Sequence, residues 1–424
     1  FNYLINKQSL IKLSINFVNE NRRGGNKFEY LPHQSDLTEQ LKHEIINSQI
    51  SYKYYSKDFS KDISIYSAIQ KTKRDSYYGS GGRVLGENDT MNYQDSLALG
   101  AYGYSEDWVI QSGIQFNWKI NYKHTFLVGT EWYQNRVSDQ FVFYQKLLNQ
   151  NVSTLGFFTQ WQWNISPKIN TLAGLRFDQN WIYSNNKLYD STIIQNINLP
   201  AIVPRIAINY KWNNNIKSRL SYAMGYRGPQ AFDEDLHIQN IGGVPRFILI
   251  SNNLKAENSQ SLNFNTEYLI NKRYWAFLNT FSMFFTQINN SFIYREARDF
   301  GDVSFLQKTN GGASQVYGID LQNQGNYLEK FKYSISLTLQ RALFINPEVL
   351  WSPDEKAIEE GFSGSELISN QILRTPNIYG FAAVEYKINK KISSEISALY
   401  TGSMLTPKVS GPKIYANSES AALQ

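Results

Sequence analysis

Four residues whose side chains could bind a cation or transfer a proton are crowded into one short part of the segment YAMGYRGPQAFDEDLH. They are Asp233, Glu234, Asp235 and His237. Carboxylate oxygens are good ligands for hard cations, but the spacing does not match an EF-hand loop and consecutive side chains point in different directions. Three roles therefore stay open: cation binding, direct contact with a substrate, and capping of a turn or short helix in a solvated loop.

Other patterns that carry chemistry are missing from the sequence. There is no cysteine, so disulfides and thiolate metal sites are excluded. The histidines are scattered without a zinc-binding spacing, at His33, His43, His124 and His237. We find no phosphate-binding loop and no Gly-x-Ser-x-Gly nucleophile motif. An enzyme is therefore not expected, and whether the protein binds a metal stays open.

The composition is unusual for a soluble protein of 424 residues, because aromatic residues reach 15% and charged residues only 18%. The mean hydropathy is nevertheless −0.44, and no apolar run is long enough for a transmembrane helix. A membrane β-barrel has this kind of average, because its strands alternate apolar and polar residues. The net charge of +6 is spread along the chain, so nucleic-acid binding is not expected.

Apolar and polar residues alternate with a period of two along most of the chain, which indicates β-strands with one apolar and one polar face. In residues 215–227, Ile216, Leu220 and Tyr222 alternate with Lys217 and Arg219. We predict about fifteen strands, with a break near Ser105 in the longest of them. Their ranges are 9–18, 41–56, 62–78, 95–120, 124–138, 152–166, 168–181, 203–213, 215–227, 256–271, 273–294, 313–327, 331–345, 375–388 and 391–403.

The links between these strands alternate between very short and long. The short links lie near 56–61, 121–123, 166–167, 213–215, 271–273, 327–330 and 389–391. Aromatic residues occupy apolar positions beside them, at Trp118, Trp161, Trp163, Trp212, Tyr268, Trp275, Tyr327, Tyr333 and Tyr386. Short turns at one end, long loops at the other and an aromatic girdle are typical of outer-membrane barrels.

A large soluble all-β protein, such as a propeller or stacked sandwiches, also alternates apolar and polar residues. Such a protein would not alternate short and long links, and a propeller would repeat a shared motif every ~40–50 residues. The sequence shows no such repeat. An all-β transmembrane barrel is therefore the better interpretation, and the polar inward positions imply a wide lumen that holds water or a plug.

Three stretches resemble motifs of the TonB-dependent outer-membrane receptors. The first, GYRGPQAFDEDLH, resembles the family's Gly-Phe/Tyr-Arg-Ala-Pro strand end, with matches at Gly225, Tyr226, Arg227 and Pro229 and with Gly228 in place of alanine. The second, LKAENSQSLNFNTEY, resembles the Leu-x-Pro-Glu-x-Ser opening of the next strand, with Ala256 in place of proline. The third, NGGASQVYGIDLQ, resembles Asn-x-x-x-Ala…Gly-x-Glu, with Asp320 in place of glutamate. The loops NENRRGG and RDSYYGSGG look like those of receptors from Bacteroidetes-type bacteria.

The resemblance implies how much of a barrel is present. Receptors of this family close about 22 antiparallel strands around a plug. Residues 1–424 would then be a single domain, a partial outer-membrane β-barrel truncated at both ends, with the plug and the first strands absent. The opening residues FNYLINKQSL agree with this expectation, because they read as the end of a strand followed by a turn.

The resemblance also implies a function: TonB-dependent active import of a bulky, scarce nutrient across the outer membrane of a Gram-negative bacterium. The substrate would be a metal chelate such as a ferric siderophore, or a corrinoid such as cobalamin, with haem as a further option. The implied partners are the TonB energy-coupling complex, outer-membrane lipid and a surface lipoprotein, without a cofactor. The alternative is a passive diffusion porin or another outer-membrane barrel without a plug.

Two groups of residues are the candidates for function. Flat aromatic rings with a few polar groups suit a bulky chelate, so we expect substrate binding in extracellular loops by Tyr77, Tyr78, Phe232, Asp233, Glu234, Asp235, His237 and Phe247. Packing within the loops is the alternative for the aromatic residues. Inward-facing charges are expected to contact the plug or to form a network inside the barrel; they are Arg176, Arg205, Arg219, Arg227, Glu267 and Asp320, with Glu131 and Asp178 on the same face.

Overall fold

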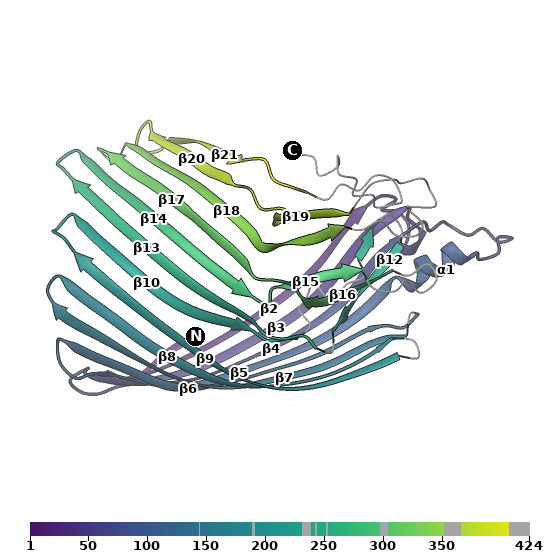
Figure 1. Ribbon diagram of the computed structural model, residues 1–424, viewed down its shortest axis with the longest axis horizontal. Coiled ribbons are helices and arrows are strands. Elements are labelled where there is room, and N and C mark those ends of the chain that lie inside the picture. The colour runs from purple at the N-terminus through teal and green to yellow at the C-terminus, as the bar shows by residue number, and fades with distance from the viewer. Residues whose placement is uncertain are drawn as a thin grey trace.

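The computed structural model describes residues 1–143, 145–188, 191–230, 239–241, 244–251, 253–296, 304–328, 330–351 and 366–406. In this part of the chain, a 17-stranded sheet curves into an incomplete tube (Figure 1). We call this sheet the wall. Neighbouring strands of the wall pair antiparallel, from β1 with β2 at one edge to β20 with β21 at the other. The expected all-β, large antiparallel barrel fold is confirmed.

The strands of the wall follow the chain in order, except that β10 pairs with β13, β14 with β17, and β18 with both β19 and β20. Their bounds are β1 Asn2–Asn6, β2 Ser9–Gly25, β3 Leu37–Tyr55, β4 Lys61–Ser80, β5 Tyr102–Lys119, β6 His124–Phe141, β7 Lys146–Ser166, β8 Ile169–Leu188, β9 Ser191–Lys211, β10 Ile216–Arg227, β13 Glu257–Asn271, β14 Trp275–Asn289, β17 Ser314–Tyr327, β18 Phe331–Trp351, β19 Leu367–Gln371, β20 Ile378–Lys387 and β21 Ser393–Thr401.

A second, four-stranded sheet is made from the two links that the wall skips. It contains β11 Gln239–Ile241, β12 Val244–Ile250, β15 Phe292–Glu296 and β16 Ser304–Asn310. Two short helices, the 3-10 helix η1 Pro32–Gln34 and α1 Tyr93–Gly100, lie at the long-loop end of the wall. In the part of the chain that the structure describes, no helix is long and apolar enough to cross a membrane.

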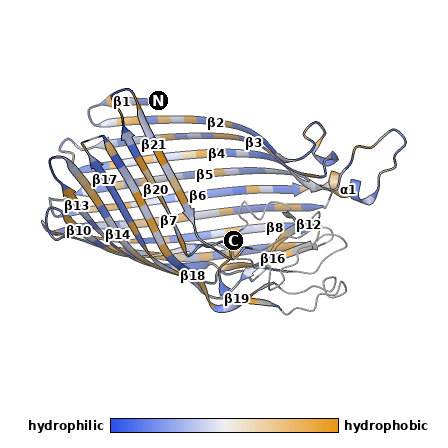
Figure 2. Ribbon diagram, turned by 90° about the horizontal axis from the view of Figure 1, so that it is seen from above, coloured by the Kyte–Doolittle hydropathy of each residue, from blue (hydrophilic) through white to orange (hydrophobic). Residues whose placement is uncertain are grey.

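Hydrophilic and hydrophobic residues alternate along the strands of the wall, as the sequence pattern predicts (Figure 2). On β9, Ile202, Ile206 and Ile208 are 64%, 48% and 43% exposed on the outer face. The next residue along the strand, Asn209, points inward, and its amide donates to the side chain of Asn170. A surface of exposed isoleucines would be costly in water but is what a lipid-facing surface requires.

The short turns share one hydrogen-bonding device. The side-chain oxygens of Asn121, Asn213 and Asn389 each accept from the backbone N–H groups two and three residues further on. This is the Asx-turn arrangement, in which a side chain replaces a backbone acceptor and holds a tight reversal.

Replacing Asn213 by alanine is expected to lower the free energy of unfolding by about 0.5–1.5 kcal/mol, because two backbone N–H groups lose their acceptor but water can reach them. Urea titration of the barrel in detergent would measure the change. Asn214→Ala in the same turn is the control and should change little. Equal losses in both variants would mean that the side-chain acceptor does not hold the turn.

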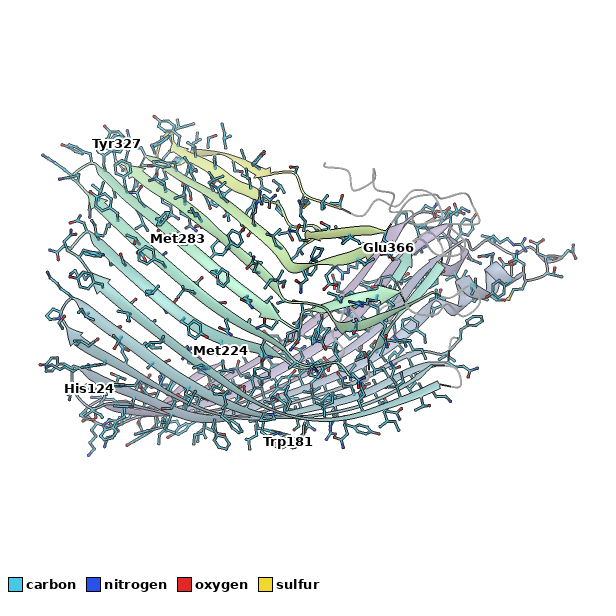
Figure 3. All side chains as sticks on the ribbon, viewed as in Figure 1. His124, Trp181, Met224, Met283, Tyr327 and Glu366 are labelled. Atoms are coloured by element: carbon cyan, nitrogen blue, oxygen red, sulfur yellow. The ribbon has the colours of Figure 1, made fainter. Side chains whose placement is uncertain are left out.

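Aromatic side chains gather at the short-turn end of the wall, where Figure 3 labels His124 and Tyr327. The rings of Trp161 and Trp163 stack with centroids 5.3 Å apart, and those of Trp275 and Tyr327 lie 4.2 Å apart. Amphipathic rings prefer the headgroup level of a membrane. The predicted aromatic belt is therefore present at this end.

Three of the differences from the predicted strands change the type or the continuity of an element. Residues 95–100 belong to helix α1 and not to a strand, because Asn92 and Asp95 form a capping box that starts the helix. The break expected near Ser105 does not occur, since β5 runs unbroken from Tyr102 to Lys119. The strand predicted for 273–294 ends at Asn289, and Phe292 already belongs to the second sheet.

Candidate functional site

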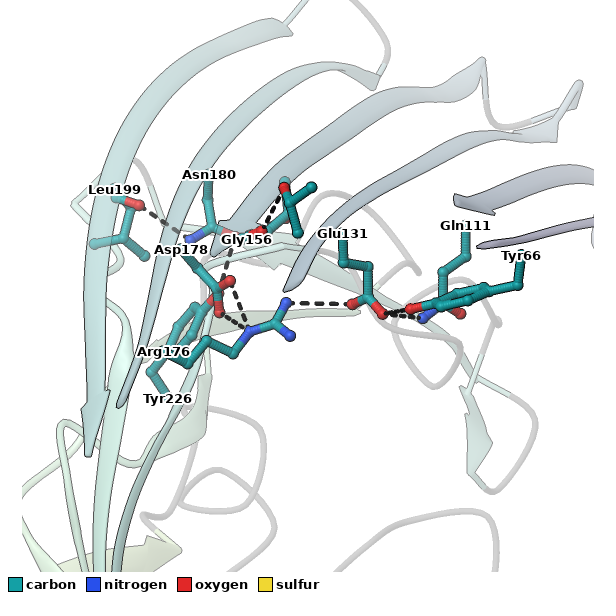
Figure 4. A network of polar contacts seen from close by, with 11 residues as sticks. Tyr66, Gln111, Glu131, Gly156, Arg176, Asp178, Asn180, Leu199 and Tyr226 are labelled. Atoms are coloured by element: carbon teal, nitrogen blue, oxygen red, sulfur yellow. Dashed lines mark hydrogen bonds and ion pairs between the residues drawn. The ribbon is translucent and has the colours of Figure 1, made fainter. Parts of the chain in front are cut away.

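A polar network crosses the inner face of the wall from β4 to β10 (Figure 4). We call it the lumen network. Its members are Tyr66, Gln111, Glu131, Arg176, Asp178, Asn180 and Tyr226. Tyr66, Gln111 and Glu131 come from inward positions of β4, β5 and β6, and the next three members come from inward positions of β8, so the alternation of the strands brings all of these to one surface; Tyr226 on β10 is the exception.

Glu131 is the acceptor at one end of this network. Its carboxylate accepts from the Tyr66 hydroxyl at 2.6 Å and from the Gln111 amide at 2.9 Å. Its other oxygen accepts from the Arg176 guanidinium at 3.2 Å. The Glu131 side chain is 17% exposed, so its charge is partly removed from water and depends on these donors.

Arg176 joins Glu131 to the second carboxylate of the network. Its Nε donates to both oxygens of Asp178, at 2.8 and 2.9 Å. The Tyr226 hydroxyl donates to Asp178 at 3.0 Å and also lies 3.1 Å from the Asn180 side-chain oxygen. Asn180 in turn donates to the Leu199 carbonyl at 3.0 Å. One cation and two carboxylates therefore alternate along the wall, and the network carries a net negative charge.

Glycine at two inward positions lets these side chains lie flat on the wall. A Cβ atom at Gly156 would overlap the Asp178 carboxylate and the Arg176 guanidinium. A Cβ atom at Gly113 would come within 2.6 Å of the Tyr66 ring. Both approaches are closer than real Cβ contacts, so these positions are glycine because the network occupies the space above them.

Tyr226 is a correction to the sequence pattern, which places it outward with Tyr222 and Met224. Its hydroxyl instead reaches Asp178 and Asn180 on the inner face. The cause is that β10 stops pairing with β9 at Ala223, four residues before it ends. Beyond that point the chain leans inward. A Cβ atom built on Gly228 would lie 3.2 Å from the Cδ1 atom of Ile182.

The other predicted lumen residues also lie on the inner face but are not brought together. Arg205 donates to the Gln160 side chain on β7. Glu267 pairs with Lys217 at 2.8 Å, and Asp320 accepts from the Thr338 hydroxyl at 2.8 Å. Arg219 stands in register between Asn209 and Asn265. These residues line the wall over many strands, so they form a polar surface and not one compact site.

Arg227 lies at the outer end of β10 and has a specific partner. Its Nε donates to the Glu257 carboxylate at 2.6 Å, and its guanidinium lies over the Phe292 ring at 4.7 Å. Arg227 thus has an ion-pair partner on the neighbouring strand β13, and its place in a charge network inside the barrel stays a prediction. Contact with a plug or an anionic substrate stays a prediction.

The predicted substrate-binding residues are only partly within the described structure. Tyr77 and Tyr78 lie at the end of β4 and not in a loop, with 1% and 9% of their surface exposed. The Tyr77 ring packs against Tyr102 with centroids 4.7 Å apart. This burial agrees with the packing alternative and leaves Tyr77 little surface for a ligand in this conformation.

The remaining loop candidates cannot be placed. Phe232, Asp233, Glu234, Asp235 and His237 lie outside the described residues, and for Phe247 the structure describes the backbone in β12 alone. Within the described ranges, no three His, Asp or Glu side chains lie close enough to hold a metal ion. Cation binding by the acidic cluster therefore stays a prediction.

Two carboxylates hold the loops near Tyr77, one by capping helix α1 and the other by an ion pair. The backbone N–H of Asn92 donates to the Asp95 carboxylate at 2.9 Å, and that hydrogen bond, helped by the Arg83 guanidinium, lowers the pKa of Asp95. In the loop before β3, the Lys27 ammonium donates to Asp36 at 2.7 Å and lowers the pKa of that carboxyl. Both carboxylates stay charged in mildly acidic surroundings, so the caps persist there.

Sequence reasoning missed four members of the lumen network, namely Tyr66, Gln111, Asn180 and Tyr226, and one of them left a signal. Tyr66 lies between Ser64 and Ala68 on the inward face of β4, so its polar hydroxyl was required to meet a partner inside the barrel. Gln111 follows the same inward parity but looks like any lumen amide. For Tyr226 the alternation gives the wrong prediction, because it places this side chain on the outer face.

Comparison with known proteins agrees with this geometry. A family model described as "TonB dependent receptor-like, beta-barrel" matches residues 7–404. No curated protein matches the sequence.

Solved structures share the fold at low identity. The alcaligin outer-membrane receptor FauA from Bordetella pertussis has a TM-score of 0.60 at 11% identity, covering 94% of this chain and 59% of its own. The siderophore receptor PiuA from Acinetobacter baumannii has a TM-score of 0.66 at 14% identity, covering 95% and 63%. The Serratia marcescens hemophore receptor HasR, bound to its hemophore and heme, has a TM-score of 0.65 at 11% identity, covering 94% and 62%.

The chain thus spans about three fifths of the length of these solved receptors. The family model covers nearly all of the wall, including the strands that carry the lumen network and the turns with their aromatic belt. The chain belongs to the TonB-dependent receptor-like β-barrel family.

Proposed function

We propose that residues 1–424 form most of the barrel of a receptor that imports a bulky, scarce nutrient by TonB-dependent active transport. Membership of the family places the chain in the outer membrane of a Gram-negative bacterium. The match of the family model over residues 7–404 is the observation that carries the proposal. The protein is a transport receptor and not an enzyme.

The match to the receptor family supports active transport over passive diffusion, and the wide polar wall fits both. The lumen network and the scattered inward charges would face either water or a plug. In our proposal they face a plug domain that precedes this chain in the full-length protein and contacts the TonB complex. A porin is the second candidate, but no observation favours it.

The proposed substrate is a ferric siderophore or cobalamin, with haem as a further option. The solved structures with this fold include an alcaligin receptor, a siderophore receptor and a hemophore receptor bound to heme. Cobalamin rests on the sequence resemblance alone, as do a surface lipoprotein partner and an origin in Bacteroidetes-type bacteria. Outer-membrane lipid would contact the exposed isoleucine face.

Binding to the full-length protein in detergent tests the substrate proposal. Ferric siderophores of the catecholate, hydroxamate and citrate types, cyanocobalamin and haem would each be titrated while tryptophan fluorescence is followed. We expect saturable binding of one class below micromolar concentration. Absence of saturable binding by all of them, together with ion conductance of the protein in planar bilayers, would favour the porin.

A further inference from the structure

The short turns of the wall are joined into one continuous rim. All along the wall, a backbone N–H at one turn or strand end donates to a carbonyl of the neighbouring turn at 2.7–3.0 Å. These hydrogen bonds run from Tyr55 to Gln8, Lys119 to Ser60, Asn164 to Lys123, Lys211 to Lys168, Leu269 to Asn215, Leu328 to Tyr274 and Lys387 to Lys330. We call residues 7–8, 56–61, 119–123, 166–168, 211–217, 271–274, 327–332 and 387–391 the rim.

The rim concentrates positive charge. It contains fifteen of the 42 lysine and arginine residues of the chain but only two of its 36 acidic residues. The rim therefore carries a net charge of +13 in a chain whose total is +6, which leaves −7 for all other residues. Its cations are Lys7, Lys57, Lys61, Lys119, Lys123, Lys168, Lys211, Lys217, Lys272, Arg273, Lys330, Lys332, Lys387, Lys390 and Lys391. Charge of one sign gathered on one surface attracts anions to that surface.

Some of these cations face the lumen and already have partners. The Lys217 ammonium pairs with Glu267 at 2.8 Å, and the Lys332 ammonium pairs with Glu385 at 3.0 Å. A lysine that is neutralised in this way attracts a further anion only weakly.

Lys61 and Lys123 are different, because they lie beside exposed aromatic rings. Lys61 follows the outward parity of Ile65, and its ammonium lies 5.4 Å from the centroid of the Trp118 ring. The Lys123 ammonium lies 5.6 Å from the centroid of the Tyr122 ring, which is 75% exposed. Both lysines are exposed, and neither forms an ion pair in the part of the chain that the structure describes. They are therefore available to an anion outside the barrel.

A row of aromatic side chains adjoins both lysines. Trp118, Phe126 and Trp161 are register partners on β5, β6 and β7, and Lys61 is the register partner of Trp118 on β4. His124, which follows Lys123 and is labelled in Figure 3, stacks on Trp161 with centroids 5.8 Å apart. The Trp161 Nε1–H also donates to His124 Nδ1 at 3.2 Å. We call Trp118, His124, Phe126, Trp161 and Trp163 the platform.

The platform sets the depth of the two lysines in the membrane. Its rings belong to the aromatic belt, and such rings prefer the headgroup level. Lysines beside them can reach the phosphates of the lipids, because their long stems cover apolar surface while the ammonium stays in a polar layer. Short turns of an outer-membrane barrel face the periplasm, so the leaflet that meets the platform is the inner one. A periplasmic polymer could reach the rim from below but would not meet rings at this depth.

We propose that the outer side of the rim binds an anionic phospholipid of the inner leaflet, whose phosphate is held by Lys61 and Lys123 and whose glycerol and upper acyl chains lie on the platform. An anionic headgroup is preferred because a zwitterionic one brings its own ammonium, which the lysines repel. The inference uses the membership of the family to place this end in the periplasm and does not depend on import.

Titration of the full-length protein with single lipids tests the preference. Purified protein in nonionic detergent would receive phosphatidylglycerol or phosphatidylcholine, and native mass spectrometry would count the bound molecules. We expect phosphatidylglycerol to bind about tenfold more tightly, because a cation near a membrane surface strengthens the binding of anionic lipid about fivefold and salt screens part of this effect. Inorganic phosphate at the same concentration should not displace the lipid. Equal affinities for the two lipids, or displacement by phosphate, would contradict the proposal.

A matched pair of double variants tests the position of the site. Lys61→Gln with Lys123→Gln is expected to reduce the preference for phosphatidylglycerol to about twofold or less. Lys217→Gln with Lys332→Gln removes the same charge from the lumen side of the rim and should leave the preference unchanged. Heat-modifiable mobility on gels would show that both barrels are folded. An equal fall in both variants would mean that the lipid responds to the total charge of the rim and that the platform site is wrong.

Sedimentation with purified peptidoglycan tests the other anionic material on this side of the membrane. We expect the unsubstituted protein and the variant with Lys61→Gln and Lys123→Gln to sediment to the same extent. Sedimentation that requires the two lysines, in a protein without a lipid preference, would identify the polymer as the partner and overturn the proposal. None of these readouts measures import, so their failure and a failure of the proposed transport can be told apart.

Discussion

Arginine in place of Ile206 is expected to prevent assembly of the barrel in the membrane. Ile206 is 48% exposed on the outer face, well away from the turn that follows β9. A charge on the lipid face near the bilayer midplane costs about 2–4 kcal/mol. That is a large share of the stability of a typical protein domain, about 5–15 kcal/mol. Heat-modifiable mobility on gels and yield in the outer membrane would measure assembly.

Two further arginine substitutions on the same strand sharpen this prediction. Asn209→Arg points inward, beside Asn170, and should be tolerated because the lumen is polar. Ile208→Arg points outward but lies closer to the aromatic belt at Trp212, so it should cost less than Ile206→Arg. Equal losses at positions 206 and 209 would show that the assigned facing is wrong.

Alanine in place of Glu131 is expected to cause the largest loss among the lumen charges. The substitution removes the acceptor of Tyr66, Gln111 and Arg176 at once. Partners left without an acceptor cost about 1–3 kcal/mol. We expect the lower half of that range, because Arg176 keeps Asp178 and its side chain is 32% exposed. Urea titration of the refolded barrel would give the free energy of unfolding.

Glu267→Ala is the matched control for this substitution. It removes a carboxylate from the same face, but its ion pair with Lys217 is exposed, with 33% and 66% of the two side chains open to solvent. Exposed pairs contribute ~0–1 kcal/mol. Glu131→Gln should recover part of the loss, since its oxygen can still accept from Tyr66. If Glu131→Ala and Glu267→Ala lose the same amount, the network adds nothing to its separate pairs.

The membrane-spanning part of the wall could be predicted because lipid imposes a simple rule there. Outward positions must be apolar and inward ones polar, so Ile206 and Asn209 reveal their faces from sequence alone. The turns were visible for a related reason: Asn213 and Asn389 end a run of alternation with the residue type that a tight reversal favours.

The outer extensions of the strands were underestimated. Strand β9 begins at Ser191 although alternation is clear only from residue 203, and β18 continues to Trp351 beyond the predicted 345. Beyond the lipid both faces can be polar, as at Gln195 and Asn196, so the period of two disappears from the hydropathy while the backbone ladder continues.

At the long-loop end of the wall, the structure differs from the prediction where segments far apart in the sequence contact each other. Nothing local in residues 244–250 says that they pair in parallel with 304–308. Tyr226 turns inward because β10 stops pairing with β9 before β10 ends. A prediction from the alternation of residues assumes that the pairing continues along the whole strand. The candidate site divides in the same way: the inward charges were named from the sequence, but their grouping around Glu131 and Arg176 was not.

Energy-dependent uptake is the most direct test of the central claim that this wall belongs to an importer. Cells that lack their own receptors would express the full-length protein and receive a radiolabelled ferric siderophore or cobalamin at nanomolar concentration. The account predicts saturable accumulation that stops when TonB is deleted or the proton gradient is collapsed. Uptake that rises linearly with concentration and continues without TonB would contradict it and identify a passive pore.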